Sequence, residues 1–245
     1  MKYVEKPNNP VDASTVLVAK NISDKILEGL KKLELKIVFG GMINYNLSAV
    51  RYHIDTQISH IGDNKFVVSP LLIDHYKLAL PDAEIISGVF SGEGSYPDDA
   101  AYNVASTGKY SIHNFKYTDR VLFSEIVGEK INVSQGYTKC SVCIVNETSV
   151  ITEDDGIATT LKRHNMDVLK ISAGDILLPG LNYGFLGGAS GKISKDKLLF
   201  AGDIKLHRDY KEIYDFCMQR DVMPVSLCEG NLVDIGSIIP VLEKE

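Results

Sequence analysis

Two titratable side chains stand two residues apart in the stretch RYHIDTQISHIGDNKFVVSP, residues 51–70, where His53 and Asp55 precede a turn. In an extended chain residues i and i+2 point to one face, so the pattern predicts that these side chains project together. A cysteine, Cys140, follows His53 by 87 residues. Beside an imidazolium, a thiol can lose its proton below its usual pKa of about 8.5 and act as a nucleophile.

That chemistry would be attack of Cys140 on an amidine, guanidine or amide carbon. His53 would donate a proton to the leaving amine, a covalent thioether intermediate would form, and water would complete the hydrolysis. Asp55 would orient the histidine or hold a cationic substrate. This chemistry needs no metal and no organic cofactor.

Each of these residues also has a purely structural interpretation. A cysteine in an apolar segment is commonly a small core residue, and a histidine and aspartate can form an exposed pair worth about 0 to 1 kcal/mol. Asn103 is typical of a turn or a strand end. In CSVC the spacing of three sends Cys140 and Cys143 to opposite faces of a strand, so a metal or redox site built on both is the least favoured alternative.

Composition limits the class of protein. The chain has 245 residues, 44% of them hydrophobic, enough to bury a substantial core. A net charge of -6 and the absence of a basic stripe argue against nucleic acid as a partner. No apolar run of about 18 residues is present and the N-terminal residues lack a secretion signal, so we expect a cytoplasmic protein that does not bind membranes. The four cysteines show no disulfide spacing.

A repeated unit must position the candidate residues. Residues 140–172 predict a strand, a turn, a second strand, a helix at 155–165 and a third strand at 166–172. The same order recurs from residues 53, 101 and 183 onwards. Residues 15–40 supply only the later part of a unit, and residues 232–242 supply only a first strand.

Joined in space, the two ends of the chain would complete a fifth unit and leave no exposed sheet edge. The sequence therefore predicts one α/β domain over residues 1–245, a five-unit pseudo-fivefold α/β propeller closed by the N- and C-terminal segments. The predicted first strands carry anchor residues spaced 48, 37, 47 and 47 apart, namely Asp55, Asn103, Cys140, Gly187 and Asp234. An open α/β sheet is the alternative, but such a sheet has one strand per helix where this chain has three.

The His-x-Asp strand, the distant cysteine and the five units together resemble the pentein fold of guanidino-group-modifying enzymes, such as arginine deiminases, dimethylargininases and amidinotransferases. HIDTQISHIGDNKFVVSP looks like the histidine strand of arginine deiminases, YPDDAAYNV is similar to the next unit, and QGYTKCSVCIV resembles the strand that bears the nucleophile. The resemblance implies Cys140 as nucleophile, His53 as acid, and Asp55 and Asn103 as binding residues around a small-molecule ligand in the central channel. The order of units implies a circular permutation.

One position departs from the family. Gly187 and Gly188 stand where the resemblance implies the first carboxylate that binds a guanidinium, while Glu229 or Asp234 stands in place of the second. A planar guanidinium needs opposed carboxylates for bidentate binding. The glycines would leave room and backbone amides for a less cationic ligand. A non-catalytic pentein that binds a small ligand or a protein partner therefore remains the alternative function.

The segment GFLGGASGK raises one further possibility, a phosphate-binding loop with Lys192 as its cation. Ile193 follows the lysine where the pattern requires Ser or Thr, and the segment leads into a strand. The phosphate-loop interpretation is therefore not favoured.

Overall fold

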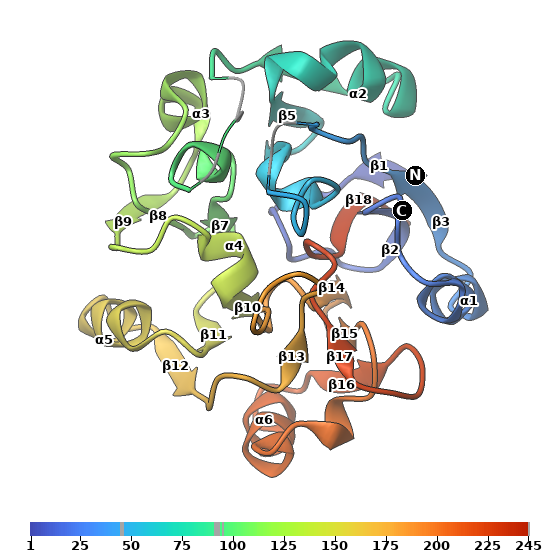
Figure 1. Cartoon of the computed structure of the whole chain (residues 1–245), viewed down its shortest axis with the longest axis vertical. Helices are drawn as coiled ribbons and strands as arrows, with labels where there is room; N and C mark the ends of the chain where they lie inside the picture. The colour runs from blue at the N-terminus through green and yellow to red at the C-terminus, as the bar shows by residue number, and fades with distance from the viewer. Residues whose placement is uncertain (45–46, 91–93, 95, 245) are drawn as a thin grey trace.

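The computed structural model describes residues 1–44, 47–90, 94 and 96–244. Within these residues, five sheets share one strand order, in which the first strand pairs antiparallel with the second and the second pairs parallel with the third. Figure 1 shows these sheets grouped around a common centre, with the helices that follow the second strands on the periphery. No helix among the described residues is long and apolar enough to cross a membrane.

The elements of the five units follow in the order of their first strands. The first strands are β18 (Ile239–Glu243), β4 (Ile58–Gly62), β7 (Ala105–Ser106), β10 (Val142–Ile144) and β14 (Ser190–Ser194). The second strands are β2 (Ala13–Val18), β5 (Lys65–Val68), β8 (Tyr110–His113), β11 (Ser149–Thr152) and β15 (Lys197–Phe200). The third strands are β3 (Lys36–Phe39), β6 (Glu84–Ser87), β9 (Glu129–Asn132), β12 (Asp167–Lys170) and β16 (Met223–Ser226).

A helix joins the second strand to the third in every one of these units. The helices are α1 (Asp24–Lys32), α2 (Ile73–Ala79), α3 (Arg120–Glu125), α5 (Asp155–Arg163) and α6 (Tyr210–Met218). Short oxygen side chains begin several of them, because the first amides of a helix lack partners within it. Ser23 accepts from Ile26 N at the start of α1, and Asp154 accepts from Ile157 N at the start of α5.

Shorter elements lie between the units. Two helical turns, η1 (Ile54–Thr56) and α4 (Thr138–Ser141), immediately precede first strands. The others are β1 (Lys2–Tyr3), β13 (Ile176–Leu177), β17 (Leu232–Val233), η2 (Pro70–Leu72), η3 (Asp98–Ala100) and η4 (Ile204–Leu206).

The two ends of the chain meet in one sheet. β18 pairs antiparallel with β2 and also with β1, which places the N- and C-termini side by side (Figure 1). Buried apolar clusters connect neighbouring units. In one of them, Val16 of β2 and Leu30 of α1 pack in the same cluster as Leu199 of β15.

The predicted first strands begin too early in every unit. All five anchor residues precede the strands: β4 begins at Ile58 after Asp55, β10 begins at Val142 after Cys140, and β14 begins only at Ser190. The same is true of Asn103 before β7 and Asp234 before β18. The expectation that His53 and Asp55 share the face of a strand was therefore wrong.

Hydrogen bonds to His53 explain the change from strand to helical turn. The Thr56 amide and the Thr56 hydroxyl both donate to the His53 carbonyl, at 3.3 and 2.8 Å. Side chains that bond the local backbone in this way compete with strand pairing. His53 consequently caps η1, and Asp55 lies within the turn.

Candidate functional site

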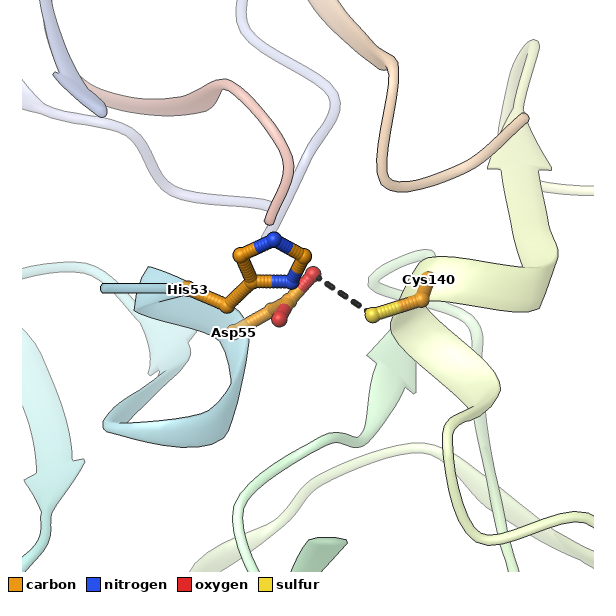
Figure 2. A group of neighbouring side chains, drawn as sticks. All are labelled: His53, Asp55 and Cys140. Carbon is orange, nitrogen blue, oxygen red and sulfur yellow. Dashed lines mark hydrogen bonds between the residues drawn. The ribbon is translucent and has the colours of Figure 1, made fainter. Parts of the chain in front are cut away.

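The candidate site forms where η1 and α4 approach each other, and Cys140 lies at its centre. The thiol of Cys140 donates to Asp55 Oδ2 across 3.1 Å, although 85 residues separate the two in sequence. Ligand atoms of His53, Asp55 and Cys140 all lie within 4.8 Å of one another. Figure 2 shows these side chains pointing together from the two helical turns.

Asn103 fixes the turn that carries Cys140. Its Oδ1 accepts from the amides of Lys139 and Cys140, at 2.7 and 3.2 Å, and its Nδ2 donates to Cys140 Sγ at 3.3 Å. The Thr138 hydroxyl bonds the carbonyls of Asn103 and Ile112. These contacts to another unit explain why Cys140 lies in a helical turn rather than in the predicted strand.

Asp234 completes the cluster on the side of His53. Its Oδ1 lies 3.7 Å from His53 Nδ1, beyond ordinary hydrogen-bond length, and its two oxygens accept from the amides of Phe185 and Gly236. Glu229, the other predicted candidate for this position, is exposed and takes no part in the cluster.

Gly187 and Gly188 provide close packing and not room for a ligand. A Cβ on Gly188 would lie 2.0 Å from Asp234 Oδ1, and one on Gly187 would lie 2.5 Å from the Cys140 carbonyl. The Gly188 amide donates to that same carbonyl at 2.8 Å. The expected free space is therefore occupied by Asp234 and by the backbone of α4.

The surroundings favour the protonated thiol of Cys140. Burial raises the pKa of this thiol well above its ordinary value, and the carboxyl groups of Asp55 and Asp234 add to the increase. The sequence predicted the opposite direction, because it could not show two acids beside the sulfur. Burial likewise raises the pKa of Asp234, while the nearby His53 opposes that increase.

Cys143 packs in the hydrophobic core and lies apart from the cluster around Cys140. It lies in β10, is fully buried, and belongs to an apolar cluster with Leu198 and Phe200. Burial raises the pKa of the Cys143 thiol to about 12. Among the described residues, Cys143 is not part of the group of possible metal ligands that includes Cys140.

Beside Cys140, His53 Nδ1 and Asp55 Oδ1 are buried and have no hydrogen-bond partner among the described residues. Buried polar groups are nearly always satisfied, so each of these atoms is available to hydrogen-bond a bound molecule. A cavity of about 260 Å³ reaches both His53 and Asp234. A larger cavity, of about 700 Å³, is instead lined by hairpin turns and the N-terminal segment, and none of its lining residues belongs to the cluster.

His53, Asp55 and Cys140 are also ligand types that zinc accepts. A metal binds the thiolate, so it would have to displace the proton from Cys140 Sγ. The carboxyl groups of Asp55 and Asp234 attract either cation, a proton or a metal.

Three further polar residues of the site were not identified from the sequence. Lys139 donates to Ser237 Oγ at 3.0 Å, and Ser237 Oγ lies 2.8 Å from Asp55 Oδ2. Glu153 accepts from the Leu186 amide at 2.8 Å and so holds the segment before Gly187. Of these three residues, only Lys139 could have been noticed in the sequence, because it directly precedes the candidate nucleophile Cys140.

Several solved structures share the fold of this chain. An amidinotransferase that acts on inosamine phosphate, from Streptomyces griseus, matches with a TM-score of 0.60 at 9% identity, over 99% of this chain and 98% of its own. The agmatine deiminase of C. jejuni matches with a TM-score of 0.56 at 8% identity, over 100% and 97%. DDAH of Pseudomonas aeruginosa, solved with citrulline, matches with a TM-score of 0.58 at 5% identity, over 94% and 100%. The chain therefore shares the α/β fold of these three solved structures.

Within that fold the chain belongs to a family of unknown function, DUF6873, whose model matches residues 17–239. A comparison with curated protein sequences found no match.

Proposed function

We propose that the protein is a cysteine-dependent hydrolase or transferase that acts at the C–N bond of an amidine, guanidine or amide in a small molecule. One observation carries the proposal: Cys140 Sγ, Asp55 and His53 meet in a buried cluster that retains unpartnered polar atoms. The solved structures of the same fold are guanidino-group-modifying enzymes, which supports this class of chemistry.

In the proposed reaction, the Cys140 proton moves to Asp55, which already accepts its hydrogen bond. The thiolate attacks the substrate carbon to form a C–S bond, and Asn103 Nδ2 donates to the sulfur as its charge develops. The C–N bond then breaks and the leaving amine takes a proton from His53. Water, or an acceptor amine in a transferase, then attacks the carbon and gives a proton to His53. The C–S bond breaks, and Asp55 returns its proton to the sulfur to restore the thiol.

Asp234 is proposed to hold the positively charged part of the substrate beside His53. The cavity at His53 and Asp234 would admit that substrate, and the backbone of Gly187 and Gly188 keeps Asp234 in place. The proposed reaction uses these side chains alone, with no cofactor, nucleic acid or membrane. We further propose that the five sheets form one pseudo-fivefold propeller domain over residues 1–245, supported by their common strand order.

Release of ammonia or amine from a panel of guanidines, amidines and amides tests the proposal. We expect Cys140→Ala to lower turnover by at least about a thousandfold, as removal of a nucleophile does. Cys143→Ala is the matched control, because Cys143 lies in the core and should affect stability rather than turnover. Equal activity of Cys140→Ala and the wild type would refute the assignment.

The second candidate function is a non-catalytic pentein that binds a small ligand or a protein partner. The burial of Cys140 specifically favours it, because burial raises the pKa of the thiol and a thiol is a poor nucleophile. No turnover with any member of the panel, together with saturable binding that Asp234→Asn abolishes, would support this alternative.

A further inference from the structure

Lys139 is a buried cation in the same helical turn as the candidate nucleophile. Its side chain is only 5% exposed, and its Nζ donates to Ser237 Oγ at 3.0 Å. An ammonium is costly to bury unless hydrogen bonds and opposite charges compensate for the lost water. A lysine that only filled space could be replaced by an apolar residue, so its charge needs an explanation.

Ser237 connects that cation to the site. Its hydroxyl oxygen accepts from Lys139 and lies 2.8 Å from Asp55 Oδ2 and 3.2 Å from the Gly187 carbonyl. Asp55 Oδ2 in turn accepts from Cys140. A continuous chain of hydrogen bonds therefore runs from Lys139 through Ser237 and Asp55 to the sulfur.

The backbone of Ser237 is held in an unfavourable conformation to make this contact. Its φ is +76°, in the left-handed region that residues with a Cβ rarely adopt, and the residue is fully buried. Gly236 before it has φ +73°, and a Cβ there would lie 2.5 Å from the Cα of His53. Such strain concentrates at functional positions. Here the strain brings the serine hydroxyl between the lysine and the aspartate.

The charged and titratable groups that surround Lys139 come from several elements. Burial lowers the pKa of Lys139 below its ordinary value, while Asp55, Cys140, Cys143 and Asp234 oppose that decrease. Two acids therefore face one resident ammonium. When Cys140 loses its proton, the ammonium is the positive charge already in place.

We propose that Lys139 is a positioning residue that acts through Ser237: it holds Asp55 against Cys140 and stabilises the thiolate when it forms. The proposal rests on the proposed function for its catalytic meaning. Its test measures ionisation of the thiol, which does not require turnover. Failure of this proposal and failure of the proposed function are therefore distinguishable.

The experiment titrates the thiolate of Cys140 by its ultraviolet absorbance, with Cys140→Ala as the blank. Lys139→Gln keeps a donor for Ser237 but removes the charge, and we expect it to raise the apparent pKa of Cys140 by about one unit or more, a tenfold effect on ionisation. Ser237→Gly removes the hydroxyl yet tolerates φ +76°, so it should shift the titration in the same direction without loss of stability.

Lys192→Met is the matched control. Lys192 is equally buried, and its Nζ donates to the Val145 carbonyl, outside the cluster. We expect it to change the unfolding transition and leave the Cys140 titration unaltered. If either Lys139→Gln or Ser237→Gly titrates as the wild type does, the proposed connection is wrong, and the lysine is only a buried structural cation.

Discussion

At the scale of single residues, the side chain of Asn103 contacts both the backbone of α4 and the sulfur of Cys140. Its Oδ1 holds the amides of Lys139 and Cys140, and its Nδ2 points at the sulfur. The first contact stabilises the fold, because an amide left unpaired in the interior costs about 1 to 3 kcal/mol. The second favours the thiolate, because a hydrogen bond to a charged group is stronger than one to a neutral group.

We expect Asn103→Ala to lower the free energy of unfolding by about 1 to 3 kcal/mol and to reduce turnover by about tenfold to a hundredfold. Urea denaturation and amine release measure the two effects. Thr138→Val is the control, since Thr138 lies in the same turn as Cys140 but its hydroxyl bonds the carbonyls of Asn103 and Ile112 and not the sulfur. If both variants lost the same share of turnover for the same loss of stability, Asn103 would have only a structural role.

The sequence named most of the residues that meet in the cluster, but it did not predict their hydrogen-bond partners or the direction of the Cys140 pKa shift. His53, Asp55, Asn103, Cys140 and Asp234 were predicted from unit spacing and resemblance, and the structure brings all of them together. Ser237 and Lys139 were missed because their contact spans 98 residues and depends on a positive φ. The raised pKa of Cys140 was missed for the same reason, since burial and two distant acids cause it.

At the scale of elements, local signals predicted the helices and failed at the inner strands. Asp154 begins α5 where the acidic residues indicated a helix start, because that signal is read within a few residues. The turn α4 was predicted as a strand because the hydrogen bonds that shape it come from Asn103 in another unit. The turn η1 was predicted as a strand although Thr56 bonds the His53 carbonyl locally. Alternating apolar residues cannot reveal such partners.

Glu153 connects the end of β11 to the segment before Gly187, and it makes stability depend on pH. Burial raises the pKa of Glu153 from its ordinary 4.5 to about 8, while the Leu186 amide opposes the increase. A carboxyl group that binds its proton more tightly when folded stabilises the fold below pH 4.5. That contribution is lost as pH rises towards about 8 and is absent above it.

Because one pKa unit corresponds to about 1.4 kcal/mol, this loss is on the order of 5 kcal/mol. We expect Glu153→Gln, which keeps an acceptor for the Leu186 amide, to flatten the pH dependence of unfolding and to be more stable than the wild type at alkaline pH. Glu147→Gln is the comparison, since Glu147 lies in an ion pair of half-exposed side chains with Lys6. Parallel stability curves for Glu153→Gln and the wild type would show that Glu153 does not titrate in this range.

At the scale of the whole molecule, the repeated order of elements was predictable from the sequence because each unit carries its own local pattern. The pairing of the two ends was predictable because each end lacks what the other supplies. β18 accordingly lies between β1 and β2, with Lys2 opposite Glu243 and Ile239 opposite Leu17. The close approach of Gly188 to Asp234 was not predictable, because a glycine in the sequence does not indicate which residue packs against it.

This arrangement predicts opposite results for two changes at the ends of the chain. A circular permutant that joins the termini with a short linker and opens the exposed loop between Leu181 and Asn182 should fold, because every sheet keeps its strands. Removal of residues 239–245 should instead unfold the protein. Ile239 and Val241 are buried, and burial of such side chains contributes about 1.5 to 3 kcal/mol each, against a total stability of about 5 to 15 kcal/mol.

Circular dichroism and thermal unfolding distinguish these outcomes. The shortened chain would also leave β2 with an unpaired edge, which favours association with other chains, so aggregation on gel filtration should accompany its loss of structure. The permutant retains that pairing and should show one cooperative transition near that of the wild type. A shortened chain that unfolds like the wild type would mean that β18 contributes little to the fold, and the two ends would then not complete a unit.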